Sequence, residues 1–193
     1  MSNGAWGDGH NGVNVYMASY WEKVADQITA LVKKYDFDGV DIDWEYPSTA
    51  GDWKRYDSFI QKLHRDLKAY NEDSVISAAL SAGALGLSKE TFDCIDRIQF
   101  MAYDGSDTDG YQSSLQQAEE GLHSFKLNGA DINKINIGIA VYGRPRHFGH
   151  HGARSRARII GKANITIFPT QIRYMTVLSA PRLLQETKRH MPC

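Results

Sequence analysis

Three acidic residues alternate with apolar ones along one short segment, where Asp41, Asp43 and Glu45 flank Ile42 and Trp44. On a β-strand, alternate side chains share a face, so the three carboxylates would point one way and the apolar residues the other. Neighbouring carboxylates would then be about 7 Å apart along the backbone. Repulsion and partial burial predict at least one raised pKa, which keeps a proton on one acid near neutral pH. A protonated donor beside an ionised carboxylate suits general acid catalysis.

Two simpler interpretations apply to the same triplet. Acids are common on a solvated strand, but the run FDGVDID is expected inside a parallel sheet, where three acids are unusual. Oxygen-rich sites also bind Mg²⁺ or Ca²⁺. On this spacing we favour catalysis over a metal site, and we expect neither a metal nor a cofactor.

The hydrophobic pattern around the triplet indicates the elements that would position it. Apolar residues recur at helical spacing in segments 21–35, 53–70 and 115–125. The runs FDGVDID, VISAALS, IQFMAY and INIGIAVY lie between polar or Gly-containing turns, which is typical of buried strands. Candidate helix caps are Ser88, for a short helix in SKETFDCID, and Ser113 or Ser114. This alternation predicts an α/β fold, in which right-handed βαβ units build a parallel sheet covered by helices.

The charge balance of the chain changes near Arg144. The 193 residues carry a net charge of −1. Residues 1–143 contain 12 Lys and Arg against 22 Asp and Glu, whereas residues 144–193 contain 10 against a single acid. The basic part lacks a clear helical period, although ANITIF and IRYMTVL have the composition of strands.

Several classes of partner find little support in the sequence. The arginines at 154–158 could attract nucleic acid, but charge without a recognisable binding fold is weak evidence, and we expect no such partner. His147, His150 and His151 lack spaced metal-binding partners and are interpreted as a solvated loop. No apolar run is long enough to span a membrane, and the opening MSNGAWGDGH lacks the regions of a signal peptide. We expect no membrane partner and no signal peptide within this chain.

The segment FDGVDIDWEYP resembles the signature of glycoside hydrolase family 18, the chitinase family, written DGxDxDxE on the fourth strand of a (β/α)8 barrel. Every specified position of the signature is matched. Trp44, Tyr46 and Pro47 resemble the chitinase branch in particular. Such a long motif on an expected strand is a specific signal.

Further segments resemble the family in the family's own order. The residues MAYD at 101–104 look like the MxYD motif that ends the sixth strand, and YGR at 142–144 looks like the segment that ends the seventh. More loosely, SNGAW at 2–6 is similar to the SxGGW stretch that ends the third strand, with Ala5 in place of a glycine.

This resemblance implies a partial (β/α)8 TIM barrel, roughly strands three or four to seven with their helices. Residues 1–145 would form the partial catalytic domain, and residues 146–193 an atypical basic tail. A complete barrel typically needs about 250 residues. The family's eighth strand ends with a tryptophan, and this chain has none after Trp53. We therefore expect a truncated member whose open sheet exposes two edges.

The resemblance also implies a retaining, substrate-assisted mechanism, in which the substrate's N-acetyl group is the nucleophile. Glu45 would act as the acid and then the base. Asp43 would bind the acetamido N–H and stabilise positive charge, and Asp41 would share a proton with Asp43. Tyr103 would hold the acetamido oxygen in line. The implied substrate-binding residues are Met101, Asp104, Tyr142, Arg144 and Trp6.

The implied partners are chitin or N-acetylglucosamine oligosaccharides, and the family implies secretion; the oligomeric state stays open. One alternative is a chitin-binding, lectin-like protein, but such proteins usually lack the acid and Glu45 is present. A second is an inactive truncated fragment, which the missing strands favour. A third is an endo-β-N-acetylglucosaminidase acting on N-glycans, although Trp44, Tyr46 and Pro47 favour chitin.

Overall fold

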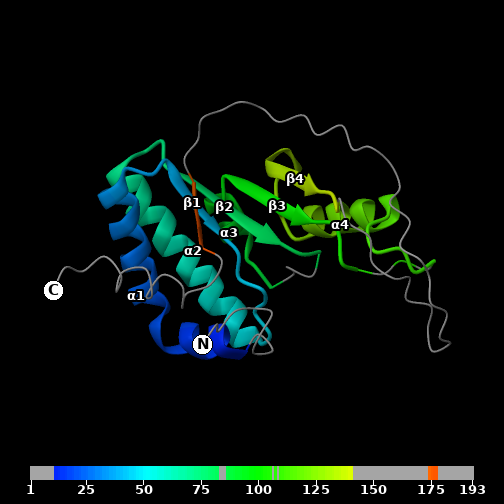
Figure 1. Cartoon of the computed structure of the whole chain (residues 1–193), viewed down its shortest axis with the longest axis horizontal. Helices are drawn as coiled ribbons and strands as arrows, with labels where there is room; N and C mark the ends of the chain where they lie inside the picture. Colours follow the sequence, from blue (N-terminus) through cyan, green and yellow to red (C-terminus); the bar gives the residue numbers. More distant parts are fainter. Residues whose placement is uncertain (1–10, 83–85, 106, 108, 141–173, 178–193) are drawn as a thin grey trace.

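Five parallel strands form one sheet in the described part of this computed structural model (Figure 1). The structure describes residues 11–82, 86–105, 107, 109–140 and 174–177. The strands are adjacent in the order β4-β3-β2-β1-β5. They comprise β1 (Gly39–Ile42), β2 (Val75–Leu80), β3 (Arg97–Met101), β4 (Ile135–Gly138) and β5 (Tyr174–Val177).

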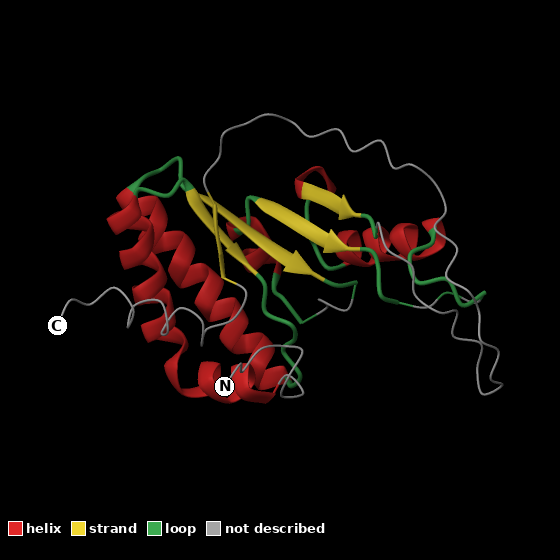
Figure 2. Cartoon of the chain, in the orientation of Figure 1, coloured by secondary structure: helices red, strands yellow, loops and turns green. Residues whose placement is uncertain are grey.

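One helix precedes β1 and others connect the first four strands. The helices comprise α1 (Asn11–Tyr35), α2 (Ala50–Tyr70), α3 (Lys89–Cys94), α4 (Leu115–Leu127) and a short 3-10 helix, η1 (Ile132–Lys134). A parallel pair needs such a crossover connection. The predicted alternation of strands and helices is therefore confirmed. Figure 2 shows α1 and α2 side by side below the sheet.

Side-chain caps set where the helices begin. Thr49 and Asp52 form a reciprocal capping box at the start of α2. Ser88 caps α3, and Ser114 caps α4 by accepting from the Gln117 backbone N–H. The cap predicted at Ser88 is confirmed, and Ser114 rather than its neighbour caps α4.

Helix α1 begins at Asn11, ten residues before the segment that its periodicity predicts. Met17, only 3% exposed, extends the apolar stripe toward the N-terminus. Asn14 interrupts that stripe in the sequence, but it is buried and hydrogen-bonded. A satisfied polar residue is compatible with a buried helix face, which a hydrophobic pattern alone does not show.

The apolar face expected for segment 115–125, which forms most of α4, is correct only in part. Phe125 is buried, whereas Leu115 is 75% exposed in the first turn. The helix lies tightly against the sheet at Gly121, where a Cβ would lie 2.1 Å from the ring of Phe100. This contact is a turn and a half beyond Leu115, which explains its exposure.

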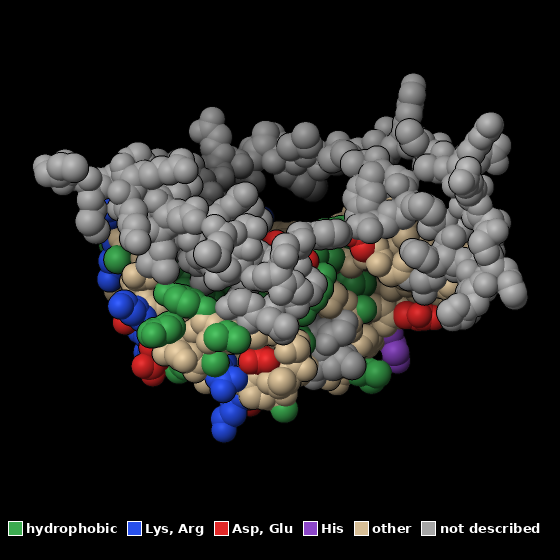
Figure 3. Space-filling view, turned by 60° about the horizontal axis from the view of Figure 1, so that its bottom comes forward, with side chains coloured by type: hydrophobic (Ala, Val, Ile, Leu, Met, Phe, Trp, Pro, Cys, Tyr) green, Lys and Arg blue, Asp and Glu red, His purple; other side chains and the backbone are tan. Residues whose placement is uncertain are grey.

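The core lies between the sheet and the helices, and α1 and α2 supply more of it than α3 and α4. The apolar side chains of the carboxylate segment are buried there: Val40 is 0% exposed, Ile42 3% and Trp44 5%. Tyr56 of α2 packs on Trp44 with ring centroids 5.0 Å apart. The apolar side chains, which are expected to point away from the carboxylates, therefore lie in the core. Charged and hydrophobic side chains are interspersed on the outer face that Figure 3 presents.

Strand β5 lies in the segment IRYMTVL, where a strand is predicted. It pairs with β1, so that Tyr174 is opposite Gly39 and Val177 opposite Ile42. The second candidate strand, ANITIF, lies outside the described residues. Among the helices that the structure describes, none combines the length and apolar character of a membrane span.

Candidate active site

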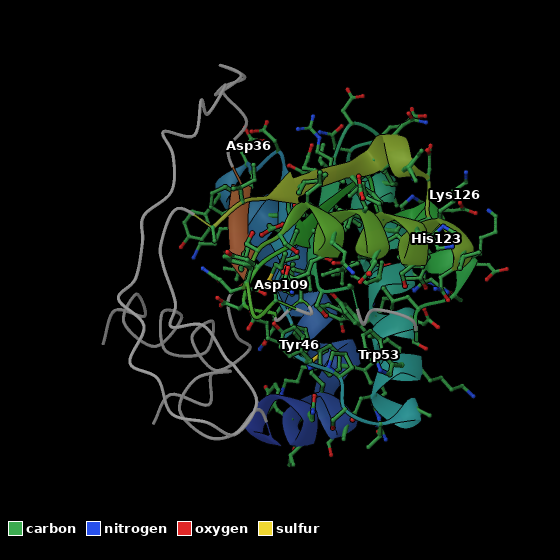
Figure 4. All side chains as sticks on the ribbon, turned by 90° about the vertical axis from the view of Figure 1, so that its right-hand side faces the viewer. Asp36, Tyr46, Trp53, Asp109, His123 and Lys126 are labelled. Atoms are coloured by element: carbon green, nitrogen blue, oxygen red, sulfur yellow. The ribbon has the colours of Figure 1, made fainter. Side chains whose placement is uncertain are left out.

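The carboxylate triplet begins within β1 and continues beyond its end. Asp41 lies in the strand, whereas Asp43 and Glu45 follow Ile42, its last residue. All three carboxylates are half-buried, and the intervening side chains are buried, so the alternation expected for a strand persists past it. Figure 4 shows Tyr46, which follows β1, well below Asp36, which precedes the strand. The triplet therefore lies at the carboxyl edge of the sheet, where α/β barrels place their active sites.

Gly39 fixes how closely β1 approaches β2. A Cβ at this position would lie 1.9 Å from the carbonyl oxygen of Val75. Next to it, the Val75 N–H donates to the Asp38 carbonyl at 2.9 Å. Only glycine allows this close approach. The Asp-Gly pair of the motif thus sets the register of the strand that carries the acids.

The register places Asp41 opposite Ser77 of β2. The Ser77 hydroxyl, in a side chain that is 3% exposed, donates a hydrogen bond to Asp41 Oδ1. Ser77 is not among the site residues that the sequence predicts. The available signal was a hydroxyl within an otherwise apolar strand, but its partner depends on strand register.

The surroundings of Asp43 raise its pKa. Burial, then the charge of Glu45 and a hydrogen bond with it, then the charge of Asp41, raise the pKa of Asp43 to about 7. Its buried Oδ1 atom has no hydrogen-bond partner. These surroundings favour the neutral acid, so Asp43 keeps a proton near neutral pH, as expected for one member of the triplet.

Tyr103 follows β3 and shares the electrostatic environment of the triplet. Burial, then the charges of Asp43, Glu45 and Asp104, raise the pKa of Tyr103. The phenol therefore stays neutral and can donate a hydrogen bond. Gly138 of β4 leaves room for the ring, because a Cβ there would lie 2.9 Å from Tyr103 Cε1. The sequence analysis also missed this second close approach.

Tyr46 has the same electrostatic neighbours as Tyr103. Burial and the charges of Glu45 and Asp43 raise the pKa of Tyr46, and Tyr103 makes a smaller contribution. The Tyr46 side chain is 39% exposed. Two neutral phenols and three carboxyl groups therefore lie within electrostatic reach of one another.

The other expected site residues fall into two groups. Met101 ends β3 and is half-buried, and Asp104 is exposed three residues later. Asp104 has a φ of 60°, and its backbone N–H donates to Gln112 Oε1 at 3.2 Å. A left-handed φ is uncommon outside glycine, although Asp tolerates it. The expected residues outside the described part of the chain are Trp6, Tyr142 and Arg144.

Metal binding is the other chemistry that a cluster of carboxylates can support. Among them, no group of three or more His, Cys, Asp or Glu side chains is placed to hold a metal. The acids of the triplet make hydrogen bonds to Ser77 and to one another instead.

Comparison with known families assigns the chain. The model of glycosyl hydrolases family 18 matches residues 4–175. The chain belongs to glycosyl hydrolase family 18. The match includes the carboxylate triplet, the MAYD segment and β4. It also extends beyond residue 145, where the sequence predicts the start of a separate tail; that boundary stays a prediction.

Curated relatives of this family 18 chain are chitinases. The endochitinase of Manduca sexta is 26% identical over 170 residues, which cover 73% of this chain and 31% of the relative. The chitinase of Autographa californica nuclear polyhedrosis virus is 33% identical over 141 residues, which cover 56% of this chain and 26% of the relative. The chain thus spans about a third of the length of the relatives it matches.

Solved structures show the same fold. The class V chitinase from Nicotiana tobaccum has a TM-score of 0.57 at 22% identity, over 80% of this chain and 52% of that one. The family 18 chitinase from Cycas revoluta, solved with allosamidin, has a TM-score of 0.58 at 20% identity, over 95% of this chain and 57% of that one. The predicted fold class, part of a (β/α)8 barrel, is confirmed.

Proposed function

We propose that this family 18 protein cleaves β-1,4-linked N-acetylglucosamine polymers, the polymers of chitin, by a retaining, substrate-assisted mechanism. The observation that supports it best is the pairing of Asp43 with Glu45. Asp43 shares a hydrogen bond with Glu45 and has a pKa of about 7. One carboxyl group can thus hold a proton while its neighbour exchanges one with the substrate.

In the first step, the Glu45 carboxyl donates its proton to the glycosidic oxygen, and the bond between that oxygen and the anomeric carbon breaks. The carbonyl oxygen of the substrate's own acetamido group forms a new bond to this carbon, which gives an oxazolinium ion. Water then attacks the same carbon and gives a proton back to Glu45. Two displacements leave the product with the starting configuration.

The neighbours of Glu45 would position the acetamido group. Asp43 would accept a hydrogen bond from its N–H, which raises the nucleophilicity of its carbonyl and stabilises the positive charge that develops. Tyr103, kept neutral by its surroundings, would donate to the carbonyl oxygen. Asp41, anchored by Ser77, would share the proton of Asp43.

The sugar chain would extend from these groups along the carboxyl edge of the sheet. Met101 and Asp104 are the described candidates for further sugar contacts. The candidates beyond the described residues are Trp6, Tyr142 and Arg144. Secretion belongs to the same proposal; one relative, from Penicillium expansum, is named a secreted chitinase.

A lectin-like function is the second candidate. The chitinase-like agglutinin from Robinia pseudoacacia has a TM-score of 0.61 at 23% identity, over 72% of this chain. A fold that serves an agglutinin can bind without cleaving, because function depends on the site rather than on the fold. Glu45 and its surroundings favour hydrolysis here.

The test compares the unchanged protein with Glu45→Gln on a fluorogenic chitotriose substrate. We expect a loss of kcat of about 100-fold or more when the acid is removed. Glu72→Gln, the same change at an exposed site, is the matched control and should retain full activity. Equal turnover in Glu45→Gln would remove the role given to Glu45. Binding of the sugar without turnover would favour the lectin, and preferential cleavage of an N-glycan would favour the endo-β-N-acetylglucosaminidase.

A further inference from the structure

Asn14, in the first turns of α1, makes three hydrogen bonds to the segment that carries Glu45. Its side chain is buried, with 8% exposed. Its Oδ1 accepts from Trp44 Nε1 at 2.8 Å. Its Nδ2 donates to the Tyr46 carbonyl at 3.1 Å and to Ser48 Oγ at 3.0 Å. One amide therefore binds the residues on both sides of Glu45.

The chemistry of these partners specifies an amide. The indole N–H of Trp44 needs an acceptor, whereas the Tyr46 carbonyl needs a donor. Aspartate would supply the acceptor without the donors, and leucine would supply neither. Because the indole is buried, loss of its acceptor leaves a polar group without a partner.

The contacts extend from Asn14 to the start of α2. Ser48 Oγ, which accepts from Asn14, donates to Asp52 Oδ2 at 3.2 Å. Asp52 also caps α2 together with Thr49. Trp44 in turn packs against Tyr56 of α2. The loop between β1 and α2 is thus held by both helices.

We propose that Asn14 is a positioning residue, which fixes the orientation of Glu45 toward the glycosidic oxygen by holding the backbone on either side of it. This inference rests on the proposed hydrolase function. A small displacement of an acid from its line of proton transfer lowers the rate of the chemical step while leaving distant sugar contacts intact. Loss of Asn14 should therefore lower kcat much more than it changes KM.

The test measures kcat and KM of Asn14→Leu and Asn14→Asp on fluorogenic chitotriose, at a temperature where circular dichroism shows each variant folded. We expect kcat to fall about 10- to 100-fold in Asn14→Leu, with KM within about twofold of the unchanged protein. Asn14→Asp keeps the acceptor for Trp44 but not the donors, and it should also lose activity. Asn128→Leu is the matched control. It removes an amide that donates to the Ser124 carbonyl at 2.8 Å on α4, and it should leave kcat unchanged.

The pH profile separates positioning from a loss of folded protein. The groups around Asp43 are Glu45, Asp41 and the neighbouring phenols, and Glu45 acts on it by charge and by a hydrogen bond. If Asn14 holds Glu45 in place, loss of Asn14 weakens the contact between Glu45 and Asp43 and lowers the pKa of Asp43. The upper limb of the kcat profile, where Asp43 loses its proton, then moves to lower pH. A smaller amount of folded enzyme would scale the profile without moving it.

The outcomes for the positioning role of Asn14 and for the hydrolase function can be told apart. If Asn14→Leu does not fold, Ser48→Ala, which removes one of the three partners, replaces it in the same assay, and an unchanged kcat there overturns the inference. Full kcat in folded Asn14→Leu, or a loss without a shift of the pH limb, overturns the positioning role alone. An inactive unchanged protein overturns the proposed function and this inference with it.

Discussion

The hydroxyl of Ser77 on β2 donates a hydrogen bond to the carboxylate of Asp41, which lies opposite it on β1. A charge-assisted hydrogen bond of this kind is stronger than one between neutral groups. It anchors the innermost member of a row of three carboxyl groups. The other two then lie progressively nearer the end where sugar would bind.

Replacement of Ser77 by alanine tests this anchor. We expect Ser77→Ala to lower the free energy of unfolding by about 1–2 kcal/mol and kcat by about 10-fold, because a hydrogen bond to a charged group is lost. Ser74→Ala is the control, since Ser74 is buried and its Oγ has no hydrogen-bond partner. It should be neutral or slightly stabilising. Equal losses in the two variants, measured by urea unfolding and by turnover, would contradict the role of Ser77.

The titration of Asp43 predicts how stability depends on pH. Its pKa is raised from 3.8 to about 7, so the folded protein binds this proton more tightly than the unfolded chain does. That contribution to stability is complete below about pH 4 and is lost as the pH rises through about 7. Asp43→Asn cannot ionise. We expect the free energy of unfolding of Asp43→Asn, relative to that of the unchanged protein, to rise by about 2 kcal/mol between pH 4 and 8. The full shift in pKa would correspond to about twice this free energy, and we halve it because Asp43 is partly exposed.

Urea unfolding of both proteins at pH 4, 6 and 8 measures this difference. Asp73→Asn, at an exposed carboxylate, is the control and should show a constant difference from the unchanged protein. If the Asp43→Asn difference were equally constant with pH, the raised pKa would be wrong.

The hydroxyl of Tyr103 is expected to act in catalysis rather than in folding. Tyr103→Phe keeps the ring that lies over Gly138 and removes the hydroxyl that we propose donates to the acetamido oxygen. We expect kcat to fall about 10- to 100-fold, with the melting temperature nearly unchanged. Tyr70→Phe, at an exposed tyrosine that ends α2, supplies the matched comparison and should be fully active. A Tyr103→Phe enzyme with normal kcat would show that another group holds the acetamido oxygen.

Gly39 is predicted to be structurally essential. An added methyl group would overlap the Val75 carbonyl, so Gly39→Ala should lower the free energy of unfolding by about 3 kcal/mol or more. At Gly51, in the first turn of α2, the nearest atom is the flexible end of Arg55 at 3.2 Å. Gly51→Ala should be neutral or stabilising by about 0.5 kcal/mol. Similar melting temperatures for the two variants would argue against close packing of β1 on β2.

Local sequence patterns predict the parts of this site that depend on one strand. The two-residue period of a strand separates Asp41, Asp43 and Glu45 from the buried Ile42 and Trp44, and the structure has this separation. Because this period places the three carboxylates on one face, it also predicts that repulsion among them raises the pKa of at least one. It does not indicate which carboxyl group has the raised pKa, because this depends on how deeply each group, such as Asp43, is buried in the folded protein.

Contacts between elements cannot be read from such patterns. The partnership of Ser77 with Asp41 requires the register of two strands. The contact between Asn14 and Trp44 joins residues that are 30 positions apart. Asn14 also interrupts the apolar stripe upstream of Met17, so periodicity alone does not carry α1 back to its start at Asn11. A polar residue with a tertiary partner has the same local signature as a helix end.

The configuration of the first product distinguishes substrate-assisted hydrolysis with retention from other mechanisms. Proton NMR of a chito-oligosaccharide, recorded within minutes of adding the protein, distinguishes the two anomers of the new reducing end before they interconvert. Substrate-assisted catalysis by Glu45, Asp43 and the acetamido group predicts that the β-anomer forms first, and that a de-N-acetylated oligosaccharide is not cleaved. Initial release of the α-anomer, or cleavage of the de-N-acetylated substrate at a similar rate, would contradict the mechanism.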